Sequence, residues 1–318
     1  MQQEIRFATF NVLNLALPGL RFYDGIEPYT PEQYDAKVSW LARKFDQLDA
    51  DVIALQEVFS QQAVTDVLAR TTRYREAAHV GFEPEPGKLT PSVALISRLP
   101  LAGPTAKHLD FPRALSVPLP ELGVCMTRFT RPILQVPVWL TPELVLNVFV
   151  VHLKSKRPDY RNGDSETDQG SIGAAVLRSM IRRGAEALGL RYLLSDFTGG
   201  RRLPLMVMGD FNDVADAVPT QLVLGGGRTL NGCDERLFEC YRLQSRRDPL
   251  RDVGYTHVHD GNFETIDHVL VSEEFNPASP HALGDVLEVA YLNDHVILRS
   301  PDASDHGAVL VRIRLGRA

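Results

Sequence analysis

Apolar and polar residues alternate along the first part of the chain and then change to helical spacing. Residues 5–13 (IRFATFNVL) alternate, which predicts a β-strand. After a loop rich in Pro, Gly and Tyr, Thr30 and Gln33 form a capping box and Pro31 takes the first helical position. A helix is therefore expected from residue 31 to residue 48. Its apolar side chains recur at helical spacing: Tyr34, Val38, Leu41, Phe45 and Leu48.

The remainder of the chain alternates between short apolar strands and helices. A helix is expected at 61–70 behind the capping residue Ser60, and another at 171–196, after a polar loop at 155–171. The apolar face predicted for the last helix consists of Leu177, Ile181, Ala185, Leu188 and Tyr192. Strands are expected at 5–13, 52–58, 93–97, 203–210, 265–272 and 308–315, and in three stretches between 122 and 153.

The order of these elements bears on fold class and domain organisation. Strands and helices are mixed, neighbouring strands in the middle look like hairpins, and no repeat, low-complexity tract or linker interrupts the chain. We expect a single domain over residues 1–318. Its architecture should be an α/β sandwich, in which two sheets pack face to face with helices outside.

Composition indicates what broad class of protein the chain belongs to. The 318 residues are 44% hydrophobic and 23% charged, as in ordinary globular proteins. No apolar run is long enough to span a bilayer, and the first residues do not resemble a signal peptide. A cytoplasmic protein without stable membrane association is therefore expected, although a clipped secreted form would look the same. The three cysteines lack C-x-x-C spacing and are expected to be reduced.

The net charge of −6 argues against a protein that holds nucleic acid by bulk electrostatics. It leaves open an enzyme with a locally basic groove and bound metal ions, because the local field dominates in a cleft.

Six apolar strands end in, or start from, polar residues of the types that catalyse reactions. A lone Asp, Asn or His beside a strand has a structural explanation, because such side chains satisfy turn backbone or pack with a hydrogen bond. Six coincident cases are harder to explain in this way, because strand ends converge at the rim of a sheet. The residues are Asn11, Asn14, Glu57, His152, Lys154, Asp210, Asn212, Asp267, Asp305 and His306.

Carboxylates gathered at one rim need a cation to balance their charge. Oxygen-rich ligand sets with few or no cysteines select hard ions, so Mg²⁺ or Mn²⁺ is expected. The two histidines could instead indicate Zn²⁺, but they lack the H-x-x-x-H spacing.

The motifs FNVLN, LQEV, VVHLKS, GDFND, IDHVLVS and SDHGAV, in this order over nearly the whole chain, resemble the endonuclease/exonuclease/phosphatase superfamily, typified by deoxyribonuclease I. HLKSK together with the stretch 255–272 is most similar to bacterial nuclease-like members. The resemblance implies a four-layer α/β sandwich of two mixed, mainly antiparallel β-sheets. It also implies hydrolysis of phosphate esters with a divalent metal ion.

The resemblance also implies roles for single residues. Glu57 in LQEV would be the principal metal ligand, with Asn11 and Asp305 near the ion. Asp210 in GDFND would orient or deprotonate the attacking water, and Asn212 would hold the phosphate or that water.

Two histidines and two of their neighbours complete the implied site. His306 would donate to a phosphate oxygen, with Asp267 fixing its tautomer. His152 would contact the phosphate from the other side, and Lys154 matches a basic position that some relatives use against phosphate. The chain departs from deoxyribonuclease I in that the glutamate that pairs there with the first histidine is not found, so we expect His152 to bind phosphate rather than to act as an acid or base.

Three functions remain open from the sequence. The first is a Mg²⁺- or Mn²⁺-dependent nuclease with DNA or RNA as its partner. Asn14 and Arg178 are further candidates for binding this substrate. The basic residues at 154–161 and 178–183 would form a surface that follows the phosphates of the nucleic acid. The same cations could equally form ordinary salt bridges. The second is a phosphohydrolase of the same scaffold acting on a lipid head group, an inositol phosphate or another small phosphate ester. The third, a non-catalytic binding module, fits poorly with an intact set of site residues; no protein partner is inferred.

Overall fold

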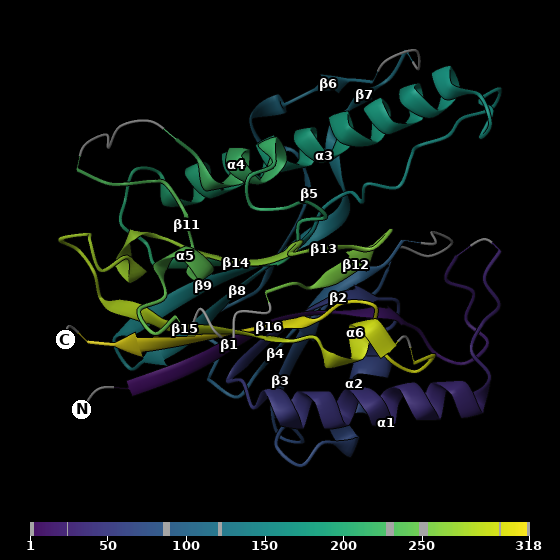
Figure 1. The fold of residues 1–318 in the computed structure, drawn as a ribbon. Coiled ribbons are helices and arrows are strands. Elements are labelled where there is room, and N and C mark those ends of the chain that lie inside the picture. Colours follow the sequence, from purple (N-terminus) through teal and green to yellow (C-terminus); the bar gives the residue numbers. More distant parts are fainter. Residues whose placement is uncertain are drawn as a thin grey trace.

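Two six-stranded β-sheets pack face to face and helices cover their outer surfaces, as Figure 1 shows for the computed structural model of the protein. The predicted fold class is confirmed, whereas the single domain stays a prediction. No described helix is long and apolar enough to cross a membrane, and the three cysteines are free. The structure describes residues 3–23, 25–84, 90–119, 123–226, 232–247, 254–298 and 300–316.

The first sheet has the strand order β15-β16-β1-β2-β4-β3 and the second has the order β11-β14-β10-β9-β8-β5. The strands of the first are β1 (Gln3–Leu15), β2 (Val52–Val58), β3 (Ala78–Gly81), β4 (Ser92–Ser97), β15 (Gly284–Leu292) and β16 (Ala308–Leu315). Those of the second are β5 (Ala106–Asp110), β8 (Arg128–Thr141), β9 (Leu144–His152), β10 (Leu205–Asp210), β11 (Phe238–Glu239) and β14 (Asp267–Val271).

Two short hairpins and the helices complete the described part of the chain. The hairpins are β6 (Val117–Pro118) with β7 (Cys125–Met126), and β12 (His257–His259) with β13 (Asn262–Glu264). The helices are α1 (Pro31–Leu48), α2 (Gln61–Arg70), α3 (Gln169–Thr198), α4 (Val218–Leu224), α5 (Cys240–Leu243) and α6 (Asp294–Leu298), with 3₁₀ turns at Pro112–Ala114 and Glu273–Phe275.

The strand directions bring the polar strand ends together. Each sheet has one parallel pair near its centre, β1 with β2 and β9 with β10. The antiparallel neighbours β16 and β14 start at the rim where these pairs end. Figure 1 shows this rim on the side of the molecule opposite the start of β1 and the end of β16. Six strand ends therefore meet at one place.

Three apolar layers hold the sheets and helices together. The first lies between the two sheets and includes Phe7, Val148 and Met208. The second packs α1 and α2 on the first sheet, and the third packs α3 and α4 on the second. At about 25 cal/mol for each Å² of apolar surface buried, these layers supply the main favourable free energy of folding and give the rim a rigid support.

Helix α1 follows its sequence prediction closely. The Thr30 side chain accepts from the Gln33 backbone N–H and the Gln33 side chain accepts from the Thr30 backbone N–H, which forms the expected capping box. Helix α2 starts after Ser60 as predicted, but the side chain of Glu83 instead accepts the backbone N–H of Gln61.

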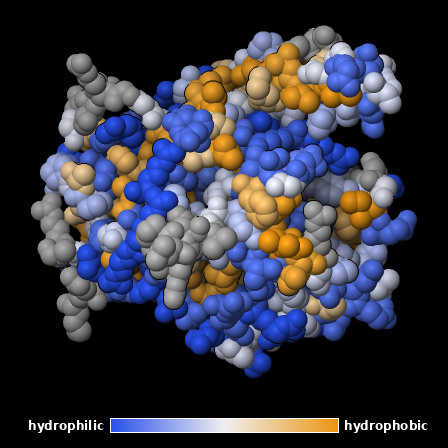
Figure 2. Space-filling model, viewed as in Figure 1, coloured by the Kyte–Doolittle hydropathy of each residue, from blue (hydrophilic) through white to orange (hydrophobic). Residues whose placement is uncertain are grey.

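The predicted apolar face of α3 is only partly buried. Ala185 of that face is buried and Ile181 packs against the third apolar layer, but Leu177 is 43% exposed, and Figure 2 shows apolar surface over this helix, to which Val176 and Met180 also contribute. The buried side of the helix also includes polar residues, which hydrogen-bond the segments around the rim. Among its residues are Arg178, Ser179, Arg183 and Glu186.

Strand β8 joins two stretches that the sequence predicted as separate strands. The proline at 132 does not end the strand, because the pairing of β8 with β5 is irregular there, between the pairs His108↔Ile133 and Asp110↔Arg128. A proline costs little where the ladder is already interrupted by a bulge. The uninterrupted strand carries Arg131 to the rim, beside the end of β9.

Candidate active site

Asp210, the last residue of β10, lies at the centre of the rim with 1% of its surface exposed. Its Oδ1 accepts the backbone N–H of Asn212 (2.7 Å). Its Oδ2 accepts Nδ2–H of Asn11 (3.1 Å) and lies 3.4 Å from Nε2 of His152 and 3.9 Å from Nε2 of His306. Burial, followed by the negative charge of Asp267, raises the pKa of Asp210 to about 7.

The glycine before Asp210 is required by the close approach of β9. Gly209 has a φ of 154°, and a Cβ atom at this position would lie 1.9 Å from the carbonyl oxygen of Val151. No larger residue fits without moving the β9 backbone. The Gly-Asp pair thus places the Asp210 carboxylate beside the end of β9, where His152 stands.

His306 and Asp267 form a buried imidazole–carboxylate pair. Nδ1 of His306 lies 2.8 Å from Oδ2 of Asp267, so the proton shared there leaves Nε2 facing Asp210. Burial alone would lower the pKa of His306, but the charge and hydrogen bond of Asp267, together with Asp210 and Asp305, raise it well above its usual value. The carboxylates around His306 therefore favour its charged form.

His152 has the opposite electrostatic setting. It is 4% exposed, and its Nδ1 has no hydrogen-bond partner among the described residues. Burial, with the positive charges of Arg131 and His306 nearby, lowers the pKa of His152 well below its usual value. The rim thus combines one charged and one neutral imidazole, which can donate to an anion from two sides.

Glu57 faces Asp210 from the first sheet, and a strained stretch of β1 holds it. The register of β1 and β2 shifts between Asn11 and Leu15, and this bulge turns Asn14 so that its backbone N–H donates to Oε2 of Glu57 (3.1 Å). Nδ2 of Asn11 donates to Oε1 of Glu57 (3.2 Å) as well as to Asp210. Non-glycine residues with positive φ concentrate at functional sites; those at this rim are Leu13, Asn14, Glu57 and Asn212.

Hydrogen bonds also fix the residues that follow β9 and β10 at the rim. Nδ2 of Asn212 donates to the carbonyl oxygen of Leu153 (3.0 Å). The backbone N–H of Lys154 donates to Glu186 of α3, and its ammonium group donates to the carbonyl oxygens of Ser155 and Arg157. Burial, with the charge of Arg131, lowers the pKa of Lys154 to about 8.

The rim contains groups that suit a divalent cation. The buried Oδ1 of Asn14 has no hydrogen-bond partner among the described residues, and it lies on the residue that holds Glu57. Asp305 is exposed, and its carboxylate lies within 4.8 Å of ring nitrogens of His257 and His306. These carboxylate, amide and imidazole groups could together hold a divalent cation.

The Asn11 side chain is oriented differently from that of a simple metal ligand. Its Nδ2, rather than its oxygen, faces the carboxylates of Glu57 and Asp210, while its Oδ1 accepts the backbone N–H of Leu13. In this orientation the amide links a carboxylate of the first sheet with one of the second. Its role as a metal ligand stays a prediction.

Lys37 on α1 is a residue of the site region that the sequence analysis missed. It is 1% exposed, and its Nζ, with no hydrogen-bond partner among the described residues, lies 5.9 Å from the ring centroid of Tyr29. Burial lowers the pKa of Lys37 to about 8, while the carboxylates of Glu57 and Asp305 act in the opposite direction. A detectable signal was present, because Lys37 occupies an apolar position of a helix between Tyr34 and Leu41.

Arg131 and His257 were also missed. Nη1 of Arg131 donates to the carbonyl oxygen of Leu153, and its buried Nε has no hydrogen-bond partner among the described residues. The ring of His257 lies 5.0 Å from that of His306, and burial followed by the charge of His306 lowers the pKa of His257. Neither residue terminates a long apolar strand, so the pattern that indicated the other site residues could not indicate these two.

The structure does not bring Arg178 to the rim cluster. Its side chain is 2% exposed, forms an ion pair with Asp164 and donates to the carbonyl oxygen of Asp159. Most cations of the expected phosphate-tracking surface are likewise paired with carboxylates, which matches the ordinary salt-bridge alternative. The pairs are Lys156–Glu264, Arg161–Asp159, Arg178–Asp164, Arg182–Asp159 and Arg183–Asp213.

Similar folds are found among solved structures. An endonuclease/exonuclease/phosphatase from Bacteroides vulgatus has 15% identity and a TM-score of 0.58, covering 99% of this chain and 100% of that one. A mannosyl-6-phosphatase from Bacteroides thetaiotaomicron has 15% identity and a TM-score of 0.56, covering 97% and 99%. The human Nocturnin catalytic domain with bound sulfate anion has 17% identity and a TM-score of 0.56, covering 98% and 95%.

No curated protein sequence matches the chain. The sequence model of the endonuclease/exonuclease/phosphatase family matches residues 8–306, a range that includes the polar rim residues from Asn11 to His306. The match confirms the resemblance inferred from the motifs. The chain therefore belongs to the endonuclease/exonuclease/phosphatase family, whose members are phosphoesterases that use divalent metal ions.

Proposed function

We propose that this protein hydrolyses phosphodiester bonds at the Asp210 rim with the help of Mg²⁺ or Mn²⁺, and that its substrate is DNA or RNA. One observation supports the proposal most strongly. A buried carboxylate with a pKa of about 7 stands between a charged and a neutral imidazole, at hydrogen-bonding or near hydrogen-bonding distance from both. That arrangement suits an attacking water on one side of a phosphate and proton donors around it.

In this proposal Asp210 acts on the attacking water. A general base is most effective when its pKa is near the working pH, and burial brings Asp210 into that range. The backbone N–H of Asn212 and the amide of Asn11 hold its two oxygens in place. The carboxylate therefore needs little reorganisation when it accepts a proton.

The two histidines stabilise the negative charge that develops on the phosphate oxygens. His306 donates from Nε2 as an imidazolium, since Asp267 fixes its tautomer through Nδ1. His152 donates from a neutral ring on the other side. Fixed donors of this kind act in a water-poor site, where each can contribute about 100-fold or more to the rate.

Glu57 and Asp305 would hold the divalent ion, with Asn14 nearby. When bound, the ion polarises the phosphate and offsets the excess of carboxylates at the rim. The nearby Lys37 offsets part of the same negative charge.

The substrate class has two candidates. Nucleic acid is favoured by the sequence likeness of HLKSK and IDHVLVS to nuclease-like members. A small phosphate ester is favoured by two other observations, the net charge of −6 and the pairing of most cations near α3 with carboxylates. One solved structure with this fold is named a mannosyl-6-phosphatase.

A substrate panel tests the proposal. Plasmid DNA, single-stranded RNA, bis-4-nitrophenyl phosphate, sphingomyelin and inositol phosphates would each be incubated with the protein under Mg²⁺ and under Mn²⁺. We expect cleavage of a nucleic acid and of the chromogenic diester, and loss of both activities in EDTA. Cleavage of sphingomyelin or inositol phosphates without cleavage of nucleic acid would establish the second candidate. No metal-dependent hydrolysis of any phosphate ester would refute the proposal.

A further inference from the structure

Potential metal ligands gather at one place in the described part of the chain. Two groups of three residues have ligand atoms within 4.8 Å of one another, and His306 belongs to both groups. One group consists of His306 with Asp210 and Asp267, and the other consists of His306 with His257 and Asp305. We call the second group, His257 with Asp305 and His306, the His257 cluster.

The His257 cluster has ligand atoms that are free to bind an ion. In the other group, most carboxylate oxygens of Asp210 and Asp267 already accept hydrogen bonds within the protein. By contrast, the His257 ring and the Asp305 carboxylate form no hydrogen bond or ion pair with any described residue. Asp305 is exposed and His257 is half-buried, so an ion can reach both from solvent.

Backbone contacts place the two imidazoles of the cluster beside each other. His257 starts β12 and pairs with His306 in an isolated antiparallel bridge. Next to this bridge, the backbone N–H of Gly307 donates to the carbonyl oxygen of Thr256 (2.6 Å). The two rings lie 5.0 Å apart between centroids. The fold therefore holds both rings at this spacing before any ion binds.

His306 is already oriented as a metal-binding histidine usually is. Such a histidine donates its other ring N–H to a carboxylate, which fixes the tautomer and the orientation of the ring. Nδ1 of His306 lies 2.8 Å from Oδ2 of Asp267, and this bond leaves Nε2 for another partner. The carboxylates of Asp267, Asp210 and Asp305 favour a positive charge at this ring. A metal ion can supply that charge in place of a proton.

The ligand types of the cluster indicate a transition metal rather than Mg²⁺. Imidazole nitrogens suit Zn²⁺, Fe²⁺ and Ni²⁺, whereas Mg²⁺ prefers oxygen ligands. Two imidazoles and one carboxylate are also a ligand set of zinc sites that keep a fourth position open. Ligand atoms around a tetrahedral Zn²⁺ lie about 3.4 Å apart, so the cluster must contract by about 1 Å. The exposed side chain of Asp305 can make that movement.

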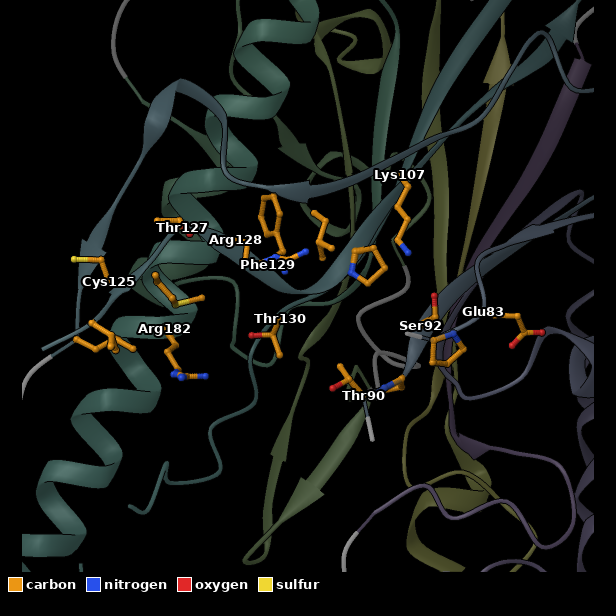
Figure 3. Close-up of a pocket in the computed structure, with 17 residues that line it drawn as sticks. Glu83, Thr90, Ser92, Lys107, Cys125, Thr127, Arg128, Phe129, Thr130 and Arg182 are labelled. Atoms are coloured by element: carbon orange, nitrogen blue, oxygen red, sulfur yellow. The ribbon is translucent and has the colours of Figure 1, made fainter. Parts of the chain in front are cut away.

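The pocket of about 410 Å³ between β4, β5 and β8 has no ligand set of this kind. Its described lining contains one carboxylate, that of Glu83, one thiol, that of Cys125, and no histidine. Figure 3 shows Glu83 and Cys125 on opposite sides of this pocket. The ligands for a transition metal therefore converge at the rim and not in the pocket.

We propose that His257, Asp305 and His306 bind a divalent transition-metal ion such as Zn²⁺, and that this ion inhibits the proposed hydrolysis. The inhibition follows from two shared residues. His306 cannot donate a proton to the phosphate while a metal ion occupies its Nε2. Asp305 is at the same time withdrawn from the Mg²⁺ or Mn²⁺ that it would hold with Glu57. The inhibition rests on the proposed function, whereas the metal site does not.

Calorimetric titration with Zn²⁺ in excess Mg²⁺ tests the metal site. Loss of a residue that only orients a metal ligand weakens metal binding about 10-fold to 100-fold. His257→Ala removes a ligand itself, so Zn²⁺ binding should weaken by about 100-fold or more. His257→Cys supplies a thiolate, another good Zn²⁺ ligand, and should recover most of the affinity. With Co²⁺ in place of Zn²⁺, His257→Cys should also gain a thiolate-to-cobalt absorption band.

The matched control is His259→Ala. His259 lies on the same short strand and stacks on His257 with ring centroids 6.2 Å apart, but it lies outside the cluster. This variant should keep the Zn²⁺ affinity of the wild type. Thermal unfolding of all variants would show that they remain folded.

Hydrolysis of bis-4-nitrophenyl phosphate under Mg²⁺ with increasing Zn²⁺ tests the inhibition. Each protein is compared with its own rate without Zn²⁺. We expect the Zn²⁺ concentration for half-inhibition to rise in His257→Ala by the same factor as the dissociation constant, and to stay unchanged in His259→Ala.

The outcomes separate the metal site from the proposed function. Equal Zn²⁺ affinity of the wild type and His257→Ala, or an equal loss of affinity in His259→Ala, would overturn the metal site. Undiminished hydrolysis at Zn²⁺ concentrations that saturate the site would overturn the inhibition. If no phosphate ester is hydrolysed, the proposed function fails, and the calorimetric comparison still decides whether the metal site exists.

Discussion

Replacement of Asp267 by Asn tests how the charge of His306 is maintained. The carboxylate lies 2.8 Å from Nδ1 of His306 and both side chains are buried. An amide keeps the shape of the carboxylate but not its charge, and it can present N–H to the ring nitrogen. The pKa of His306 should then fall, because burial lowers it and the carboxylate that raises it most is removed.

The size of the effect follows from the type of bond removed. A hydrogen bond to a charged group contributes about 1.5–3 kcal/mol, which corresponds to a loss of about 10-fold to 150-fold in kcat/KM at neutral pH. The pH profile shows in which direction the pH dependence of activity shifts. In the wild type the pKa of His306 is raised, so activity should persist as pH rises above the usual histidine range. In Asp267→Asn the loss of activity at the basic side should begin at a lower pH.

The assay is kcat/KM for bis-4-nitrophenyl phosphate from about pH 5 to about pH 9, a range that covers the titration of histidine. Glu239→Gln is a matched control, because Glu239 lies 3.0 Å from Nδ1 of His268 in a second buried imidazole–carboxylate pair outside the proposed site. This control should change thermal stability but not the pH profile. An unchanged profile in Asp267→Asn, or the same shift in Glu239→Gln, would refute the reasoning.

Three further predictions concern stability and metal binding. Because the pKa of Asp210 is raised in the folded protein, this side chain stabilises the fold below about pH 4, and the stabilisation is lost as pH rises through about 7. Over this range the metal-free wild type should lose up to about 4 kcal/mol of unfolding free energy relative to Asp210→Asn. Denaturant unfolding measures the difference. Lys37→Met should tighten Mn²⁺ binding severalfold in calorimetry, because it removes a buried cation near the carboxylates that would hold the ion, whereas Lys44→Met, on the same helix, should not. Weaker binding in Lys37→Met would contradict this. Gly209→Ala should destabilise the protein by about 3 kcal/mol or more because its Cβ meets the Val151 carbonyl; a melting temperature equal to that of the wild type would show that β9 can move aside.

The strand ends could be predicted from the sequence because the signal is local. An apolar strand that runs directly into Glu57 or Asp210 identifies both the element and the residue to which it leads. The spatial meeting of these ends follows from strand direction, which the hydrophobic pattern does not contain. The contact between Asn11 and Asp210, residues on different sheets, is known only from the structure.

The prediction for α3 was only partly right, for a physical reason. Ala185 of the predicted face is buried, but Leu177 is exposed and the helix also buries polar residues, since their hydrogen bonds hold the segments beside the site. Glu186 illustrates this, because its carboxylate accepts the backbone N–H groups of Thr130 and Lys154. Hydrophobic periodicity cannot anticipate a buried face that is selected by hydrogen bonds from distant loops.

The central claim is tested most directly by metal-dependent hydrolysis in wild type and Asp210→Asn, on the substrate that the panel identifies. Both proteins would be shown to be folded and to bind Mn²⁺, and initial rates would be measured with Mn²⁺ and with EDTA. We predict hydrolysis by the wild type with Mn²⁺ only, and a rate for Asp210→Asn lower by about 1,000-fold or more, as expected for loss of a general base in a preorganised site. Wild-type activity in folded Asp210→Asn would contradict the assignment of the rim as the active site.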